Sequence, residues 1–259
     1  MSRRIVLNTL AYKQIFSQDP ALTQLDILQE IKAAGYQDIE IRREYVKAGE
    51  EEIKRIAVTA KVQNLNLYYS VPDELFKDSE LNPVLEMYFK EAAILNSSQV
   101  KLNLGKLHTL LPEQAQKLLQ VTNTYPAIRL LIENDQNQEK SNSLRLKTFM
   151  EQAKEFNVPV GLTFDIGNFH VIQEDVFESV NNLLPYVEYV HIKNAKKTET
   201  GYESTDIASG DVNIEKVLKL FPPTILCGIE YSCGGKEEIQ QKMEYERNLI
   251  LEMAAQGSL

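Results

Sequence analysis

Short β-type runs alternate with amphipathic helical stretches along almost the whole chain, and this alternation most constrains the fold. We expect eight strands, over residues 4–10, 38–42, 65–70, 99–104, 128–133, 160–164, 186–192 and 224–230. Between them, apolar residues such as Leu25, Leu28 and Ile31 recur at helical spacing, which indicates helices with one buried face. Eight strands and eight helices in strict alternation over 259 residues predict an α/β fold of the (β/α)8 TIM-barrel type. A doubly wound open sheet is the main rival.

The composition is that of a globular protein, with 43% hydrophobic and 25% charged residues. No linker, low-complexity run or shift in composition divides the chain, so we expect one TIM-barrel domain over 1–259. The net charge of −9, without a basic cluster, argues against nucleic acid as a partner. Anionic small molecules remain possible ligands, because an acidic protein can still contain a local basic pocket.

Membrane insertion and secretion are not expected from this sequence. No apolar stretch reaches the roughly 18 residues that a membrane span needs, and the short apolar run in 1–8 is typical of a strand rather than a signal peptide. Cys227 and Cys233 lack metal or redox spacing, so we expect free thiols and a cytoplasmic location. A homodimer is one possible oligomeric state, because the sequence does not distinguish the surfaces through which barrels dimerise.

Four ionisable residues lie at the ends of four successive expected strands: Glu133, Asp165, His191 and Glu230. They are separated by 32, 26 and 39 residues, and each interval can hold one helix and one strand. In a barrel, all four would therefore meet at the carboxyl ends of the strands, where catalytic groups lie. Two Glu, one Asp and one His form a ligand set for a hard or borderline divalent cation.

Each of these residues also has a simpler explanation when it is taken alone. Glu133 could be a solvated charge or a helix cap, and Asp165 could cap the turn that follows it. His191 could be a hydrogen-bonded core residue, and Glu230 could form a buried ion pair with a lysine. All four explanations would have to coincide at one level of the same barrel, so a cation site is the favoured interpretation.

Small residues precede two of the expected ligands on the same strand face. Because side chains alternate along a strand, Gly161 and Thr163 share the face of Asp165, and Gly228 shares the face of Glu230. We expect these small inward residues to leave room for a cation and a substrate.

Four segments carry a resemblance to a known family: Ile-Glu-Asn-Asp at 132–135, Phe-Asp-Ile-Gly-Asn at 164–168, Val-His-Ile-Lys at 190–193 and Gly-Ile-Glu-Tyr at 228–231. In this order, and over nearly the whole chain, they resemble the sugar phosphate isomerase/epimerase family with a xylose-isomerase-like TIM barrel. The chain looks closest to a short branch associated with 2-ketogluconate utilisation.

The resemblance implies that Glu133, Asp165, His191 and Glu230 bind a divalent metal ion. Manganese is the common ion in the family, and Mg²⁺, Co²⁺ or Zn²⁺ are alternatives. The resemblance also implies that Glu133 and Glu230 act as the acid/base pair.

The chain departs from the family pattern at two positions. Many epimerases of the family have His three residues after the Asp ligand and Arg six residues after the His ligand, where this chain has Asn168 and Lys197. Both positions usually touch substrate, so the substrate cannot be transferred from the family. A DNA-repair endonuclease branch shares the barrel and binds three zinc ions through further His residues. This chain offers only His108, His170 and His191, so we do not expect it to belong to that branch.

The expected substrate contacts are polar residues near the carboxyl ends of strands or in the loops after them: Glu40, Arg42, Ser70, Lys101, Asn168 and Lys193. Arg42 could hold a substrate carboxylate through two parallel hydrogen bonds, or it could form a local ion pair at the barrel mouth. Lys193 shares the strand face of His191. Lys101 and Lys193 are also the lysines with which Glu230 could pair.

Glu133 and Glu230 come from expected strands three apart in a ring of eight, so they can flank a bound molecule. Two groups that each act as acid or base, on opposite faces of a substrate, can move a proton beside a carbonyl. A cation between them would polarise the carbonyl and stabilise an enediolate. We therefore expect a divalent-metal-dependent isomerase or epimerase of a small keto sugar or sugar acid. A metal-dependent lyase or dehydratase on the same barrel and a non-catalytic sugar-binding barrel are the alternatives.

Overall fold

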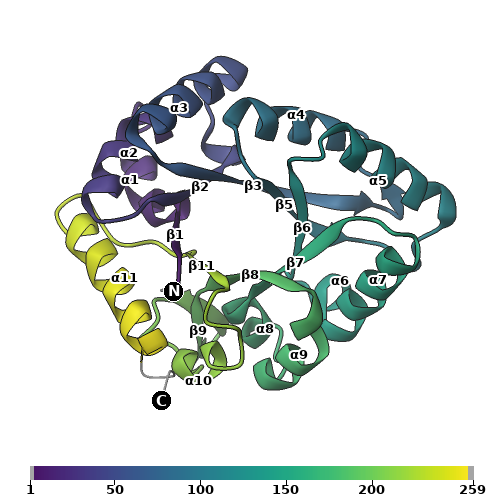
Figure 1. Cartoon of the computed structure of the whole chain (residues 1–259). Coiled ribbons are helices and arrows are strands. Elements are labelled where there is room, and N and C mark those ends of the chain that lie inside the picture. The colour runs from purple at the N-terminus through teal and green to yellow at the C-terminus, as the bar shows by residue number, and fades with distance from the viewer. Residues whose placement is uncertain (1–2, 256–259) are drawn as a thin grey trace.

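Eight parallel strands close into a ring in this computed structural model, which describes residues 3–255 (Figure 1). The strands of the ring are β1 (Ile5–Asn8), β2 (Asp38–Arg42), β3 (Asn66–Lys77), β5 (Gln99–Gly105), β6 (Arg129–Glu133), β7 (Val160–Asp165), β8 (Val187–Ile192) and β11 (Leu226–Ile229). Each strand pairs with the next along the chain, and β11 pairs with β1. The closed ring confirms the TIM-barrel prediction and excludes the open sheet.

Helices surround the ring, as Figure 1 shows. They are α1 (Lys13–Gln18), α2 (Gln24–Ala33), α3 (Gly49–Gln63), α4 (Leu85–Leu95), α5 (Pro112–Thr124), α6 (Gln138–Ser141), α7 (Ser143–Glu155), α8 (Ile166–Val171), α9 (Val176–Leu183), α10 (Ile214–Leu218) and α11 (Ile239–Ala255). Within residues 3–255, none of them combines the length and the apolar character of a membrane span.

The expected strict alternation of eight strands with eight helices is wrong in detail. Two helices each follow β1, β6 and β7, and an antiparallel hairpin of β9 (Asn194–Thr198) and β10 (Gly201–Thr205) lies between β8 and α10. Polar side chains start the additional helices. Asn142 lies between α6 and α7, and its side chain accepts a hydrogen bond from the amide of Arg145, which caps the second helix. Asp165 caps α8 in the same way.

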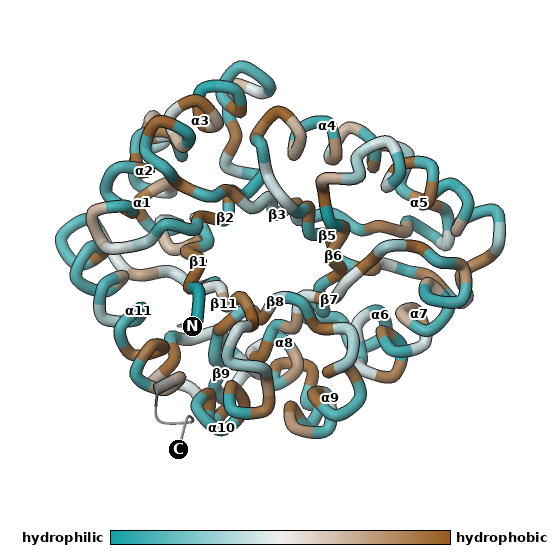
Figure 2. Tube along the Cα trace, viewed as in Figure 1, coloured by the Kyte–Doolittle hydropathy of each residue, from teal (hydrophilic) through white to brown (hydrophobic). Residues whose placement is uncertain are grey.

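The core lies between the ring and the helices. On α3, Ile53, Ile56 and Ala60 are buried, whereas Val58 and Val62 face solvent. Figure 2 shows the corresponding pattern, with hydrophobic and hydrophilic residues alternating along the helices. Each large aliphatic side chain buried in this way stabilises the fold by about 1.5–3 kcal/mol. The helices thereby hold the ring, and the ring positions the site.

Two adjacent layers of side chains inside the ring lead towards the carboxyl ends of the strands. Val6, Tyr68, Leu131 and Tyr189 pack together in the lower, apolar layer. Because strand side chains alternate, the residues two positions later point to the same interior one layer nearer the carboxyl ends, and these are Asn8, Ser70, Glu133 and His191. A polar layer therefore lies directly on an apolar one.

Strand β3 runs seven residues beyond its expected end and pairs with the short antiparallel strand β4 (Glu80–Leu81). Asp73 holds this extension in place. Its Oδ2 accepts hydrogen bonds from Tyr88 (2.6 Å), Lys77 (2.9 Å) and Asn82 (2.9 Å). Burial alone would raise the pKa of Asp73, but these hydrogen bonds lower it to about 2.

We expect Asp73→Asn to destabilise the protein at pH 7 by about 1 kcal/mol, a value reduced for the partial exposure of the site. A carboxylate whose pKa is lower in the folded state stabilises the fold above its unfolded pKa, here 3.8, and loses that contribution as the pH falls towards 2. Urea unfolding at pH 7 and pH 3 tests this: the difference between variant and wild type should shrink at pH 3. A difference independent of pH would contradict the ionic role of Asp73.

Candidate metal centre and active site

Four potential metal ligands meet at the carboxyl ends of neighbouring strands. Glu133 ends β6, Asp165 ends β7, His191 lies in β8 and Glu230 follows β11 directly. One donor atom from each lies within 4.8 Å of the others, and all four residues are buried. Two donors on opposite sides of one ion are separated by about 4–5 Å, given bonds of about 2.0–2.6 Å. The donor set therefore fits a single divalent cation.

Asp165 combines a local structural role with a place among the candidate metal ligands. Its Oδ1 accepts a hydrogen bond from the amide of Asn168 (2.7 Å), which is the cap expected from the sequence. Its Oδ2 lies 2.9 Å from the ammonium of Lys193 and faces the other candidate ligands. Complete burial raises the pKa of Asp165 to about 7, although Lys193 acts in the opposite direction. The carboxylate form of Asp165 therefore depends on a nearby cation.

The two ring nitrogens of His191 have different partners. Nδ1 contacts Glu133 and lies 3.4 Å from Oε2 of Glu230, so it faces the candidate metal position. Nε2 lies 2.8 Å from Oε2 of Glu40, and the Tyr189 hydroxyl donates a 2.7 Å hydrogen bond to the same oxygen. Burial lowers the pKa of His191, but the surrounding carboxylates raise it above its ordinary value. A carboxylate bound to the distal nitrogen orients a histidine ligand and makes it more basic.

Glu40 differs from its expected role as a substrate contact. The side chain is fully buried between Tyr189 and His191, where it has no access to the barrel mouth. Burial raises the pKa of Glu40, but the imidazole of His191 outweighs this effect and lowers the pKa to about 2. Because Glu40 is enclosed by these two side chains, it fits the role of orienting His191 rather than that of touching a substrate.

Two lysines inside the barrel pair with the candidate ligands. Lys101 contacts Glu133 and lies 3.7 Å from Oε1 of Glu230. Lys193 lies 3.2 Å from Oε2 of Glu230, in addition to its contact with Asp165. The buried ion pairs that the sequence left open for Glu230 are therefore present. Burial raises the pKa of Glu230, yet the nearby imidazole and ammonium groups lower it well below its ordinary value.

Arg42 and Ser70 lie beside this cluster on β2 and β3. Nη1 of Arg42 lies 2.7 Å from Oε1 of Glu230, and its Nε contacts Glu44 at the barrel mouth. The hydroxyl of Ser70 is fully buried and has no hydrogen-bond partner among residues 3–255. Both side chains therefore remain candidates for contact with a bound molecule.

At Asn168, one of the two positions that depart from the family pattern, the side chain serves the local structure. Its amide nitrogen donates to the carbonyl oxygen of Asn134 (2.8 Å), and its Oδ1 accepts from Gln136 (3.0 Å). At the other position, Lys197 lies exposed on β9. Asn134 was not expected, although it follows Glu133 directly in the sequence. Its side chain exchanges two hydrogen bonds with the backbone of Asp165, at 2.8 and 2.9 Å, and so ties two ligand strands together.

The space above Gly228 is not available to a ligand. A Cβ atom at this position would overlap the Tyr189 hydroxyl and lie 2.8 Å from Cζ of the same ring. A Cβ at Gly161 would lie 2.8 Å from Cδ2 of Leu131. The expectation that these glycines leave room for a cation and a substrate is therefore wrong, because neighbouring side chains of the barrel fill the space.

We expect Gly228→Ala to destabilise the protein by about 1–3 kcal/mol, because the new methyl group overpacks the interior. Tyr189 would have to move away from Glu40, so the variant should also loosen the support of His191. Urea unfolding measures the loss. Gly235→Ala is the control, because its Cβ would meet only the end of Gln14, at 3.6 Å. Equal stability of the two variants would contradict the close approach of Tyr189.

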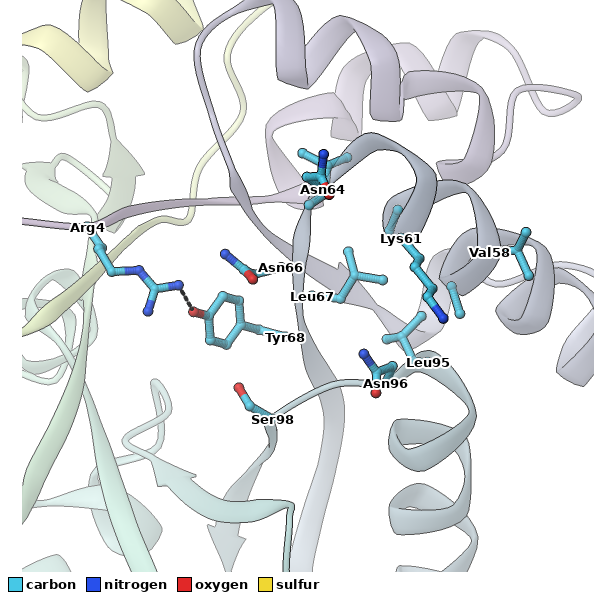
Figure 3. Close-up of a pocket in the computed structure, with 13 residues that line it drawn as sticks. Arg4, Val58, Lys61, Asn64, Asn66, Leu67, Tyr68, Leu95, Asn96 and Ser98 are labelled. Carbon is cyan, nitrogen blue, oxygen red and sulfur yellow. Dashed lines mark hydrogen bonds between the residues drawn. The ribbon is translucent and has the colours of Figure 1, made fainter.

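One surface crevice lies away from these residues. It has a volume of about 770 Å³ and is lined by residues such as Arg4, Lys61, Asn66 and Tyr68. Figure 3 shows Arg4 reaching the hydroxyl of Tyr68, a 2.8 Å hydrogen bond. These residues belong to the amino-terminal ends of β1 and β3 or to α3, and this end of a TIM barrel serves stability rather than catalysis. None of the candidate ligands lines the crevice.

No protein-family model matches the chain, and no curated protein matches it either. Solved structures with the same fold do exist. An L-ribulose 3-epimerase superposes with a TM-score of 0.70 at 16% identity, covering 98% of this chain and 96% of its own. The probable 3-DHS dehydratase AsbF from Bacillus anthracis gives 0.67 at 14% identity, over 95% and 98% of the two chains.

A third solved structure contains a metal ion. A xylose isomerase-like TIM barrel protein from Mycobacterium smegmatis, in complex with magnesium, gives a TM-score of 0.64 at 15% identity, over 99% and 98% of the chains. At these identities the likeness establishes the fold and leaves the activity to the residues of the site. The chain thus has the xylose-isomerase-like TIM-barrel fold, which sugar isomerases and epimerases share.

Proposed function

We propose that this protein is a divalent-metal-dependent isomerase or epimerase of a small keto sugar or sugar acid. The observation that carries the proposal is the meeting of Glu133, Asp165, His191 and Glu230 within 4.8 Å at the carboxyl ends of the strands. Three carboxylates and one imidazole suit Mn²⁺, with Mg²⁺, Co²⁺ or Zn²⁺ as alternatives. The shared fold with an L-ribulose 3-epimerase and a magnesium-bound barrel supports the proposal.

Glu133, Asp165, His191 and Glu230 would hold the cation, which when bound would polarise the substrate carbonyl and stabilise negative charge on its oxygen. Glu133 and Glu230 extend from β6 and from the end of β11, which are three strands apart in the ring. One carboxylate takes the proton from the carbon beside the carbonyl, and the other returns a proton on the opposite face. Return of the proton to the same carbon inverts that stereocentre, whereas its delivery to the former carbonyl carbon moves the carbonyl group and isomerises the sugar.

The neighbouring side chains set the protonation of this pair. The pKa of Glu133, which burial and Glu230 raise, is lowered overall by Lys101 and His191. The pKa of Glu230 is lowered as well, so both carboxylates are ionised in the free protein and either can act as the base. Asp165 and His191 serve the cation, and Glu40 orients the imidazole through Nε2.

Metal analysis of the purified protein, followed by solvent-deuterium incorporation into a panel of keto sugars and 2-keto acids, tests the proposal. We expect a bound divalent metal and incorporation of deuterium at the carbon beside the carbonyl of one substrate. Exchange accompanied by loss of water would favour a dehydratase. Binding of metal and sugar without exchange would instead favour a non-catalytic sugar-binding barrel.

A further inference from the structure

Lys193 contacts the same carboxylate oxygens that a divalent cation on the candidate ligand set would use. Its Nζ lies 2.9 Å from Oδ2 of Asp165 and 3.2 Å from Oε2 of Glu230. We propose that Lys193 competes with the divalent cation for these two oxygens, so that its ammonium pairs with the ligand carboxylates when no metal is bound and weakens the binding of metal. This inference rests on the proposed function, because it concerns the metal site on which that function depends.

The oxygens that Lys193 contacts lie on the side of the site that faces Nδ1 of His191. Oε2 of Glu230 is 3.4 Å from this nitrogen, and Oε1 of Glu133 contacts it. Oδ1 of Asp165 caps α8, so its Oδ2 is the atom left to face a cation. The donors available to one cation are therefore Nδ1 and these three oxygens, and Nζ of Lys193 lies within 3.2 Å of two of the three.

Lys101 and Arg42 contact the ligand carboxylates at their other oxygens. Lys101 contacts Oε2 of Glu133 and lies 3.7 Å from Oε1 of Glu230. Nη1 of Arg42 lies 2.7 Å from the same Oε1. These contacts can persist beside a bound cation, because a carboxylate that binds a metal through one oxygen still accepts hydrogen bonds at the other. Lys193 thus differs from both in the atoms that it contacts, and not in its charge.

An ammonium and a divalent cation cannot share an oxygen in a buried site without strong repulsion. Asp165 is fully buried, and the side chains of Lys193 and Glu230 are 8% and 5% exposed, so little water screens the two charges. Binding of either cation therefore opposes binding of the other. Lys193 follows the end of β8 at Ile192, so its long stem can carry the ammonium towards the mouth of the barrel.

The position of the Lys193 stem is built into the turn that holds Asp165. A Cβ atom at Gly167, in the first turn of α8, would lie 3.0 Å from Cγ of Lys193. Glycine at this position therefore makes room for the stem. Because Asp165 caps the same helix, the turn that orients this carboxylate also leaves the space in which the lysine reaches it.

Titration of the full-length protein with Mg²⁺, followed by calorimetry, tests the inference through Lys193→Met, which keeps an unbranched stem and removes the charge. The titration is carried out at about pH 9, well above the pKa of about 7 for Asp165, so that a proton does not compete with the metal. We expect Mg²⁺ to bind at least about tenfold more tightly to the variant than to wild type. Equal or weaker binding would overturn the inference.

Thermal unfolding of the same two proteins gives a second measurement. Without metal, Lys193→Met should melt at a lower temperature than wild type, because Asp165 and Glu230 lose their ammonium partner. Saturating Mg²⁺ should raise the melting temperature of the variant more than that of wild type, since a ligand stabilises the state that it binds. An equal rise in both proteins would contradict competition.

Two further Lys→Met substitutions separate competition from a general loss of positive charge. Lys140 pairs with Glu74, and neither is a candidate ligand, so Lys140→Met should leave the affinity for Mg²⁺ unchanged. Lys101→Met removes a buried charge that contacts the other carboxylate oxygens, and it should not reproduce the tightening. If Lys101→Met bound Mg²⁺ as tightly as Lys193→Met, competition for shared oxygens would be refuted.

Acetylation of lysines in the wild-type protein tests the inference even if Lys193→Met does not fold. The protein is treated briefly with acetic anhydride, with and without saturating Mg²⁺, and the labelled positions are measured by mass spectrometry. Mg²⁺ should speed the acetylation of Lys193, because the displaced amine moves towards solvent. Lys140, which is partly exposed, should react equally in both conditions. Unchanged or slower acetylation of Lys193 in Mg²⁺ would overturn the inference.

The two proposals fail in different ways. Metal-dependent deuterium exchange by the wild type, with an unchanged affinity for Mg²⁺ in Lys193→Met, would leave the isomerase proposal intact and overturn the competition. Tighter binding of Mg²⁺ by Lys193→Met, without deuterium exchange into any sugar, would support the competition and contradict the isomerase proposal.

Discussion

Glu230→Gln should lower the rate of solvent-deuterium exchange by about 10²–10⁴-fold, the range expected for loss of a general acid/base. Glutamine has nearly the shape of glutamate but can neither take nor return a proton. The fold should survive, because Lys193 keeps its 2.9 Å contact with Asp165 and Lys101 keeps its contact with Glu133. Exchange measured at saturating metal, together with circular dichroism of the variant, checks both expectations.

A control is needed because Glu230 is also a candidate metal ligand. Measuring metal affinity for the same variant shows whether exchange is lost at full metal occupancy. Glu188→Gln provides the matched substitution: Glu188 lies near the amino-terminal end of β8 and pairs with Arg129 at the start of β6, where both side chains are exposed, and its removal should leave exchange unchanged. A rate of deuterium exchange equal to that of the wild type in the Glu230→Gln variant would refute the assignment of Glu230 as an acid/base.

Epimerisation and dehydration begin with the same step on this scaffold. Both remove a proton beside a carbonyl, and they differ in whether a proton returns to carbon or a hydroxyl group leaves. The fold is shared with an L-ribulose 3-epimerase and with a probable 3-DHS dehydratase, so the fold does not separate them. Two acidic side chains on opposite sides of the site support return of the proton, which is why epimerisation or isomerisation is the favoured reaction.

The positions of the strands could be predicted because burial imposes a strong pattern on them. The bounds of β2 match the expected 38–42, and the other strands of the ring include most of their expected residues. The closed ring then places the carboxyl ends of the strands at one level, since all eight strands of a TIM barrel run in parallel. This is why four residues far apart in sequence could be expected to meet, and the structure brings them together.

The contacts of the residues that surround the candidate ligands could not be predicted in the same way. Whether Glu40 faces a substrate or supports His191 depends on which side chains its carboxylate contacts, and strand periodicity does not give these contacts. The extension of β3 and the β9–β10 hairpin were missed for a related reason. Both depend on individual polar contacts, such as those of Asp73 and of Asn194, whose side chain donates to the carbonyl oxygens of Ile207 and Val212.

Glu40→Gln should weaken binding of a divalent metal by about 10–100-fold, the effect expected when the hydrogen-bond partner of a histidine ligand is altered. Glutamine can still accept a hydrogen bond from Nε2 of His191 or from the Tyr189 hydroxyl. It no longer supplies the negative charge that makes the imidazole a stronger ligand at Nδ1. Titration of the metal-free protein with Mn²⁺, followed by calorimetry, measures the change in affinity.

Glu52→Gln is the matched control for this substitution. Glu52 is also buried, but it lies on α3 and accepts hydrogen bonds from the amides of Lys47 and Ala48, away from the barrel interior. The Glu52→Gln substitution should lower the stability of the fold and leave the affinity for metal unchanged. If Glu40→Gln bound Mn²⁺ as tightly as wild type, while the same titration detected weaker binding by His191→Ala, then the contact of Glu40 with Nε2 would be structural only. If Glu40→Gln weakened Mn²⁺ binding and Glu52→Gln did not, the contact of Glu40 with Nε2 of His191 would contribute to the affinity of the metal site.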